Sequence, residues 1–403
     1  MTVIYLDNNA TTRVAPEVVD VMLPYLRDFY GNPSSMHVFG GQVGQAVRDA
    51  RSQVAQLIGA EDTEIVFTSC GSEGNNTAIH AALAAQSDRR HIITTEVEHP
   101  AILNVCKHLE KKGYTVTYLS VDAQGQLDLM ELEAAMTGGT ALVTVMAANN
   151  ETGVLFPIEE VGAIAKEYGA TVHVDAVQAV GKVPINLKTS TIDLLTLSGH
   201  KLHAPKGIGA LYVRRGFKFR PFLLGGHQER GRRAGTENVP GLIALGKAAE
   251  LAYQDLRHNL QGTSQEKLLR DRLEQGLLER IPDTAVNGHL IHRLPNTTNI
   301  GFKYIEGEAI LFLLNKYGIC ASSGSACTSG SLEPSHVLRA MGLPYTILHG
   351  SIRFSLSRYT TVAEVDTVLE VMPDIVERLR AMSPFSNDEA GWLQDRSEAV
   401  AVR

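Results

Sequence analysis

The chain has 403 residues, of which 44% are hydrophobic, and its formal net charge is −7. This length exceeds the ~250–300 residues at which a single hydrophobic core stops growing, so we expect two domains. The acidic balance argues against nucleic acid or an anionic membrane surface as a partner. The four cysteines (positions 70, 106, 320 and 327) are too sparse for a disulfide framework and predict reduced thiols.

The N-terminal segment lacks the cationic start and apolar run of a secretory signal. We also find no apolar run that approaches the ~20 residues needed to span a bilayer. The sequence therefore predicts a cytoplasmic protein without a membrane partner.

Short apolar runs alternate with helical patterns through the first half of the chain, an order typical of parallel βαβ units. Their Val, Ile and Leu content is what strands buried on both faces require. The predicted strands are 64–68, 91–95, 115–119, 141–146, 171–175, 193–197 and 209–213, with intervening helices that include 100–112 and 158–168.

A long helical pattern follows from Val239 to Arg280 and loosens near 261–263. Two shorter strands, at 297–302 and 351–355, precede an amphipathic helix near 362–380.

The pattern as a whole predicts an α/β fold with two domains. The large domain, residues 15–255, carries a mostly parallel sheet flanked by helices. A smaller α+β domain takes residues 1–14 and 256–403. The last twenty residues are polar and weakly patterned, so we expect a mobile C-terminal tail.

Two charged residues stand at the ends of predicted strands. Asp175 closes the run at 171–175, and Lys201 follows the run at 193–197. Ligands of open parallel sheets bind outside the carboxyl ends of the strands, so both residues should face one crevice. A lysine amine can form a Schiff base with pyridoxal phosphate, and burial would lower its pKa; a carboxylate can keep the pyridine nitrogen protonated. Taken alone, the two residues fit a solvated strand-end pair equally well.

Polar residues at neighbouring strand ends favour the cofactor. The run Thr-Ser-Cys-Gly-Ser at 68–72 follows a strand and opens a helical pattern, which places N–H groups and hydroxyls where a phosphate would bind. Ser198 and His200 flank the lysine and can donate to the same phosphate. The remaining candidates are His99, which could lie over the ring or move protons, and the amides of Asn150 and Gln178, which could reach the ring's phenolic oxygen.

Cys327 lies in a run of small residues, Ser-Ser-Gly-Ser-Ala-Cys-Thr-Ser-Gly-Ser at 322–331. A run without a large apolar anchor predicts an exposed, mobile loop, which we place at 321–332. Accessibility is what a reactive thiol requires; the alternative is an incidental cysteine in a linker. We expect Cys106 and Cys320 to be buried, because both stand among apolar residues.

A series of motifs resembles the cysteine desulfurases, which are fold-type I pyridoxal phosphate enzymes. The resemblance covers nearly the whole chain in the family's order, and it is strongest to the nitrogenase-associated (NifS-type) branch, with the housekeeping Isc-type branch next. The matching runs are YLDNNATT (5–12), GNPSSMH (31–37), EHPA (98–101), NNETG (149–153), VDAVQAVGK (174–182), SGHKLHAPKGIG (198–209), GGHQERGRRAGTEN (225–238), ASSGSACTSGSLEPSHVLRAMG (321–342) and SIRFSLSRYTT (351–361).

The resemblance implies a role for each candidate. Lys201 would bond covalently to the cofactor, Asp175 would pair with the pyridine nitrogen, and His99 would stack on the ring as an acid–base residue. Arg353 would bind the substrate carboxylate as a bidentate fork, together with Asn150. The other implied cofactor contacts are Gly71, Ser72, Asn150, Gln178, Ser198, Gly199, His200 and, across the subunit interface of a homodimer, Thr236. Ser72 departs from the family's usual Thr but keeps the hydroxyl.

The implied activity is conversion of L-cysteine to L-alanine, with the sulfur taken up by Cys327 as a persulfide. An iron–sulfur scaffold protein would accept the sulfur, for cluster assembly and, in this branch, for nitrogenase maturation in nitrogen fixation. The same thiolate is a candidate iron ligand in a nascent cluster shared with the scaffold.

Two other interpretations stay open. The chain could be another pyridoxal phosphate enzyme of this fold, such as an aminotransferase or a selenocysteine lyase, although an aminotransferase has no use for the exposed thiol at Cys327. It could also be a non-catalytic protein that uses the fold to bind a partner, which the presence of both Lys201 and Cys327 disfavours. Basic clusters at 214–220 and 229–233 fit a subunit interface better than nucleic acid.

Overall fold

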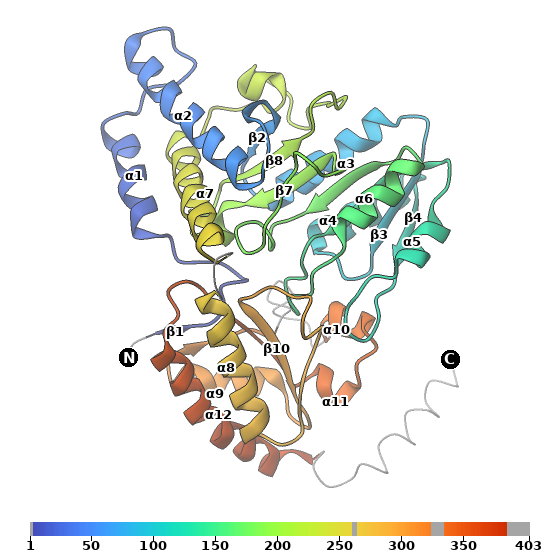
Figure 1. The fold of residues 1–403 in the computed structure, drawn as a ribbon, viewed down its shortest axis with the longest axis vertical. Coiled ribbons are helices and arrows are strands. Elements are labelled where there is room, and N and C mark those ends of the chain that lie inside the picture. Colours follow the sequence, from blue (N-terminus) through green and yellow to red (C-terminus); the bar gives the residue numbers. More distant parts are fainter. Residues whose placement is uncertain (1–2, 260–263, 324–333, 385–403) are drawn as a thin grey trace.

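The computed structural model describes residues 3–259, 264–323 and 334–384, whose elements form two sheet-based regions (Figure 1). A seven-stranded sheet with its helices makes up one region, and a three-stranded sheet with further helices makes up the other. The predicted loop around Cys327 and the predicted C-terminal tail lie outside the described residues.

The larger sheet has the strand order β2-β8-β7-β6-β5-β3-β4. Neighbours from β4 through β7 pair in parallel, whereas β8 pairs antiparallel with both β7 and β2. The reversal follows from the short connection at 199–208, because a parallel return needs a crossover of a dozen or more residues. The strands are β2 (Ile65–Thr68), β3 (His91–Thr95), β4 (Thr115–Leu119), β5 (Thr140–Met146), β6 (Thr171–Asp175), β7 (Leu194–Ser198) and β8 (Gly209–Val213). The mostly parallel sheet predicted from the sequence is confirmed.

Helices cover both faces of this sheet, which is why its strands read as continuous apolar runs. Adjacent strand residues join different cores: Leu142 packs in the core under α3 and α4, and Val143 packs in the core under α2, α6 and α7. The helices of this region are α1 (Pro16–Arg27), α2 (Val38–Leu57), α3 (Gly71–Ala85), α4 (Pro100–Glu110), α5 (Leu129–Ala135), α6 (Ile158–Glu167) and α7 (Val239–Asn259).

The smaller sheet is antiparallel, with the order β12-β10-β9, and a short parallel pair joins β1 to β11. The strands are β1 (Ile4–Tyr5), β9 (Thr284–Val286), β10 (Thr297–Phe302), β11 (Ile319–Cys320) and β12 (Ser351–Ser355). The helices are α8 (Gln265–Arg280), α9 (Gly307–Lys316), α10 (His336–Ala340), α11 (Tyr345–Leu348) and α12 (Val362–Met382).

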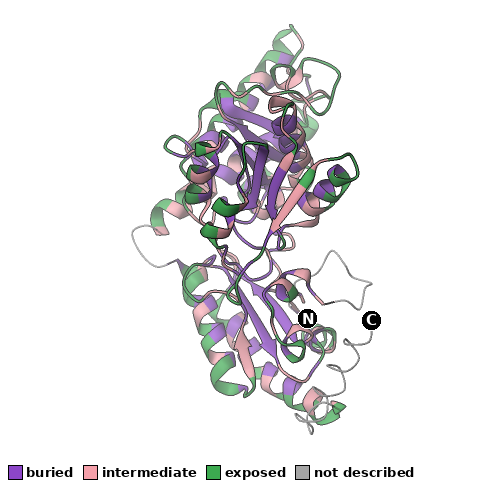
Figure 2. Cartoon of the chain, turned by 90° about the vertical axis from the view of Figure 1, so that its right-hand side faces the viewer, coloured by how far each residue is buried: buried purple, intermediate pink, exposed green. Residues whose placement is uncertain are grey.

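A separate core holds this region together. It contains Ile4 and Leu6 of the N-terminal arm beside Leu273 of α8 and Val368 of α12. The buried strands form the interior of both regions in Figure 2, while outward helix faces are exposed. The two cores support the proposed division into residues 15–255 and residues 1–14 with 256–403, with the exception of α10, whose Val337 and Leu338 pack in the core of the larger region.

The N-terminal arm crosses between the two regions. The Asn8 amide donates to the carbonyl of Ser355 at 2.9 Å, and the Thr12 N–H donates to the carbonyl of His200 at 3.0 Å. The arm is therefore positioned by both sheets and passes directly beside the segment that carries Lys201. Within the described residues, every helix is too short or too polar to cross a membrane.

Candidate active site

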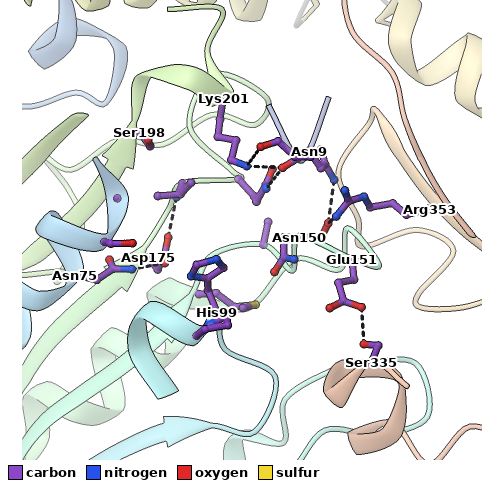
Figure 3. Close-up of a pocket in the computed structure, with 18 of the residues that line it drawn as sticks. Asn9, Asn75, His99, Asn150, Glu151, Asp175, Ser198, Lys201, Ser335 and Arg353 are labelled. Atoms are coloured by element: carbon purple, nitrogen blue, oxygen red, sulfur yellow. Dashed lines mark hydrogen bonds between the residues drawn. The ribbon is translucent and has the colours of Figure 1, made fainter. Parts of the chain in front are cut away.

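A cavity of about 530 Å³ lies where β5, β6 and β7 end, against the N-terminal arm and β12 (Figure 3). Ligands of open α/β sheets bind at this edge. The predicted site residues that line the cavity are Gly71, Ser72, His99, Asn150, Asp175, Gln178, Ser198, His200, Lys201 and Arg353. The fold thus brings together residues that span more than half of the chain.

Three predicted residues are not placed in this cavity. Gly199 is buried beside it, and its N–H donates to the carbonyl of Ile208 at 2.9 Å. Thr236 is exposed and does not line the cavity of its own chain. Cys327 lies outside the described residues.

One end of the cavity offers donors for an anion. Helix α3 begins at Gly71, and its N-cap residue, Cys70, makes no side-chain capping hydrogen bond, so the first N–H groups of the helix need other acceptors. A Cβ atom at Gly71 would approach Val177 Cγ2 to 2.9 Å, so glycine keeps this entrance open. The buried Ser198 hydroxyl has no hydrogen-bond partner among the described residues. An orphaned buried hydroxyl costs free energy, which a phosphate oxygen would offset.

The carboxylate of Asp175 lies at the end of β6, and both of its oxygens accept hydrogen bonds. One accepts from the N–H of Val177 at 3.0 Å, and the other accepts from the side-chain amide of Asn75 at 2.6 Å. Asn75 was not predicted from the sequence. Its position three residues after Ser72, on the same face of a helix, is a signal that could have found it.

Lys201 lies in a short 3-10 turn, Gly199–Lys201, directly after β7. Its amine donates to the carbonyls of Asn9 at 2.5 Å and Ala10 at 2.8 Å, so the N-terminal arm positions it. Asn9 also accepts, at its carbonyl, a bond from the Gln178 amide at 2.9 Å. The sequence did not single out Asn9, whose backbone rather than side chain carries these contacts.

A second lysine, Lys182, lies near Lys201 and is half-buried. The Lys182 amine donates to the Gln178 side-chain oxygen at 2.9 Å and to the Asn9 side-chain oxygen at 3.2 Å. Burial, with the positive charges of Lys201 and Arg353, lowers the pKa of Lys182 to about 7. The charges of Lys201 and Arg353 therefore make the surroundings of Lys182 electropositive.

Two histidines at the cavity are neutral at physiological pH. Burial lowers the pKa of His99, Lys201 and His336 lower it further, and Asp175 opposes the shift. The Nδ1 atom of His99 accepts from the N–H of Ala101 at 3.1 Å, so the neutral ring carries its proton on Nε2. Burial also lowers the pKa of His200 to about 4, together with nearby lysine charges.

Arg353 of β12 forms the opposite side of the cavity. Its guanidinium donates to the Asp7 carboxylate at 2.6 Å and to the Asn150 carbonyl at 3.0 Å. Its Nε has no partner among the described residues, and the side chain is only 2% exposed. This leaves N–H groups of a fixed, buried cation for an anionic ligand.

Further residues on the Arg353 side of the cavity were not predicted from the sequence. The Ser335 hydroxyl donates to the buried Glu151 carboxyl at 2.5 Å, and both line the cavity with His336 and Arg339. Burial raises the pKa of Glu151, although Ser335, His336 and Arg353 oppose the shift. These residues could not be predicted, because residues 151 and 335 lie far apart in the chain and no local pattern relates them.

These groups fit pyridoxal phosphate. The amino end of α3 and the orphaned Ser198 hydroxyl suit its phosphate, Asp175 suits its pyridine nitrogen, and Lys201 suits its aldehyde. Within the described residues we find no group of His, Cys, Asp and Glu side chains that could hold a metal ion.

Comparison with known proteins agrees with this arrangement. Residues 4–368 match the aminotransferase class-V family. The chain is 77% identical over 401 residues to cysteine desulfurase 2 of Trichormus variabilis, with 100% of both chains covered. It is 58% identical over 399 residues to the cysteine desulfurase NifS of Azotobacter vinelandii, covering 99% of this chain and 98% of that protein.

Solved structures show the same likeness. A NifS-like protein superimposes with a TM-score of 0.87 at 39% identity, covering 94% of this chain and 100% of that one. The cysteine desulfurase of Thermococcus onnurineus gives a TM-score of 0.82 at 29% identity, covering 94% of this chain and 95% of that one. The chain therefore belongs to the aminotransferase class-V family and, within it, to the cysteine desulfurases.

Proposed function

We propose that this protein is a pyridoxal phosphate-dependent cysteine desulfurase that takes sulfur from L-cysteine and leaves L-alanine. The observation that carries the proposal is the single cavity in which Lys201, Asp175 and the amino end of α3 face Arg353. Pyridoxal phosphate is the cofactor of this family. Other reactions depend on the same cofactor. Family membership and Cys327 are therefore the reasons for proposing sulfur transfer.

Different side chains of the protein carry out different parts of the proposed reaction. When bound, pyridoxal phosphate withdraws electrons from the carbon atoms of an amino acid attached through its amino group. Arg353 binds the carboxylate of L-cysteine, and Lys201 accepts its α-proton. His99 lines the cavity, and because its Nδ1 is an acceptor, its Nε2–H is the group that can donate a hydrogen bond or a proton there.

Cys327 is the proposed sulfur acceptor. Its thiolate forms an S–S bond with the substrate sulfur as the C–S bond of the substrate breaks. The electron pair of that bond stays on the β-carbon, which takes up a proton and becomes the methyl group of alanine, and Lys201 returns a proton to the α-carbon. The persulfide that results carries the sulfur to the next protein.

The proposal includes a homodimer in which Thr236 reaches the partner's cavity. Support comes from the exposure of Thr236 and from large apolar side chains left on the surface, among them Tyr30, Val38 and Leu224, which are 75%, 79% and 82% exposed. Exposed apolar groups of this size favour burial against another chain.

The proposal also includes an iron–sulfur scaffold protein as acceptor, with Cys327 as a shared iron ligand and nitrogenase maturation as the pathway. Support comes from the 58% identity to the protein named NifS and from the affinity of thiolates for iron. We place the protein in the cytoplasm, where thiols stay reduced.

The decisive experiment replaces Cys327 by Ser. We expect sulfide release from L-cysteine in the presence of a thiol reductant to collapse, while the visible absorption band of the bound cofactor remains. Cys320→Ser is the matched control, because Cys320 pairs in β11 and does not line the cavity. Sulfide release by Cys327→Ser at the wild-type rate would show that Cys327 is not the nucleophile.

A further inference from the structure

Asn75 holds the carboxylate of Asp175 from inside the protein. The side-chain amide of Asn75, which is 1% exposed, donates to one oxygen of Asp175 at 2.6 Å (Figure 3). The N–H of Val177 fixes the other oxygen. The carboxylate therefore cannot turn about its last bond without losing a hydrogen bond.

The direction of this contact is unambiguous. An ionised carboxylate only accepts hydrogen bonds, so the amide nitrogen of Asn75 must be the group that faces Asp175. The amide oxygen of Asn75 is then left buried with no partner among the described residues. Burying a carbonyl oxygen without a hydrogen-bond partner costs folding free energy, and the hydrogen bond that Asn75 donates to Asp175 offsets that cost.

Helix α3 is pressed against the sheet at this point, which fixes Asn75 in place. A Cβ atom at Gly74 would lie 2.6 Å from Thr196 Cγ2, so the helix could not approach β7 as it does with a larger residue there. Ser72 lies at the amino end of the same helix, one turn before Asn75. One turn of α3 thus presents its first N–H groups to the phosphate end of the cavity and Asn75 to Asp175.

We propose that Asn75 is a positioning residue for pyridoxal phosphate, which it holds indirectly by orienting the Asp175 carboxylate. The hydrogen bonds from Asn75 and Val177 together fix the orientation of the carboxylate that would pair with the pyridine nitrogen. The same helix turn then sets the distance between the phosphate site and the ring-nitrogen site. This inference rests on the proposed function, because it assumes the cofactor.

The first test measures the dissociation constant of pyridoxal phosphate for the full-length protein stripped of cofactor. We expect Asn75→Ala to weaken binding by roughly tenfold to a hundredfold, since a hydrogen bond to a charged group is lost. Asn76→Ala is the matched control: its amide is on the same helix but donates to the Ser72 carbonyl. Equal affinity in wild type and Asn75→Ala, within about twofold, overturns the proposal.

The second test separates positioning from folding, with Asn75→Asp. At low pH the introduced carboxyl group keeps a proton and can still donate to Asp175; at higher pH the two carboxylates repel each other. We therefore expect the affinity ratio of this variant to wild type to fall as pH rises. Glu98 and His99 interact electrostatically with Asp175, and both proteins carry these two groups, so the comparison is between proteins that differ at residue 75 alone.

The outcomes distinguish the two proposals. A pH-independent affinity ratio for Asn75→Asp overturns the role of Asn75, even where Asn75→Ala binds cofactor poorly because it folds poorly. Wild-type protein that fails to bind pyridoxal phosphate overturns the proposed function instead. Unfolding temperatures of the cofactor-free proteins show whether any loss of binding arises from misfolding.

Discussion

The two sides of the cavity are built differently. The side formed by α3, β6 and β7 uses residues at the ends of neighbouring strands in one parallel sheet, such as Asp175 and Ser198. The side formed by Arg353 depends on Asp7 and Asn150, which lie 346 and 203 residues away in the chain. The cofactor side is thus a property of one sheet, whereas the substrate side exists only when the N-terminal arm and the smaller region meet that sheet.

The difference predicts that the two sides can be damaged separately. Changes at strand ends should reduce affinity for pyridoxal phosphate, and changes around Arg353 should reduce affinity for L-cysteine. Substitutions at Arg353 and Ser198 test this separation.

The largest expected effect is at Arg353. Arg353→Ala should raise the KM for L-cysteine by roughly tenfold to a hundredfold, because hydrogen bonds between a buried cation and the substrate carboxylate are lost. Arg353→Lys should recover little, since a point charge cannot replace the planar fork. The affinity for pyridoxal phosphate, measured by titration, should stay near the wild-type value.

Arg272→Ala is the control for this measurement, because Arg272 is an exposed arginine that pairs with Asp366 on the surface. A wild-type KM in Arg353→Ala would remove Arg353 from the substrate site. A large loss of cofactor affinity in the same variant would mean that the two sides are not separable.

The next effect concerns Ser198, on the cofactor side. Ser198→Ala should weaken pyridoxal phosphate binding by about tenfold, as expected for a lost hydrogen bond to a charged group. The cofactor-free variant should unfold at the same temperature as wild type or higher, because the substitution removes an orphaned buried hydroxyl.

Calorimetry with and without cofactor measures both quantities. Ser120→Ala is the control, since the Ser120 hydroxyl donates to Glu131 at the surface. If Ser198→Ala destabilised the cofactor-free protein, the hydroxyl would have a structural partner and the phosphate role would lose its main support.

A separate effect, on stability rather than on binding, is a pH dependence at Glu98, which precedes His99. Burial, together with the charge of Asp175, raises the pKa of Glu98 from 4.5 to about 8, against opposing hydrogen bonds from Met146 and Thr95. The folded state therefore holds a proton that the unfolded state releases above pH 4.5. This group's stabilising contribution is complete below pH 4.5 and is lost as pH rises towards about 8.

Glu98→Gln should flatten this dependence, which has a slope of at most about 1.4 kcal/mol per pH unit for one group. The measurement is the free energy of unfolding of the cofactor-free protein, by denaturant titration at several pH values. Glu96→Gln, at an exposed position two residues earlier, is the control. An unchanged pH profile in Glu98→Gln would mean that this carboxyl does not titrate with folding.

The strands of the larger sheet show how much of the fold could be predicted from the sequence. Every strand predicted in the larger sheet is present to within one residue at either end, because burial on both faces produces apolar runs that are visible locally. The direction of β8 was not visible in this way. It depends on the length of the connection from β7, which has no crossover helix among residues 199–208.

The long helical pattern from 239 to 280 shows a limit of the same method. The structure has two helices there, α7 in the core of the larger sheet and α8 in the core of the smaller one. Both have regular apolar spacing, and spacing alone does not tell which core a helix joins.

The sequence by itself determined the strands of the larger sheet, their ends and the types of residue placed on them, because each of these depends on neighbours in the chain. It thereby placed Lys201, Asp175 and Ser198 together before any coordinates were known. Only the tertiary structure decided which groups hold those residues: the carbonyl of Asn9 on Lys201, Asn75 on Asp175 and Asp7 on Arg353. These contacts join segments far apart in the chain, and a hydrogen bond between such segments leaves no local pattern from which it could be predicted.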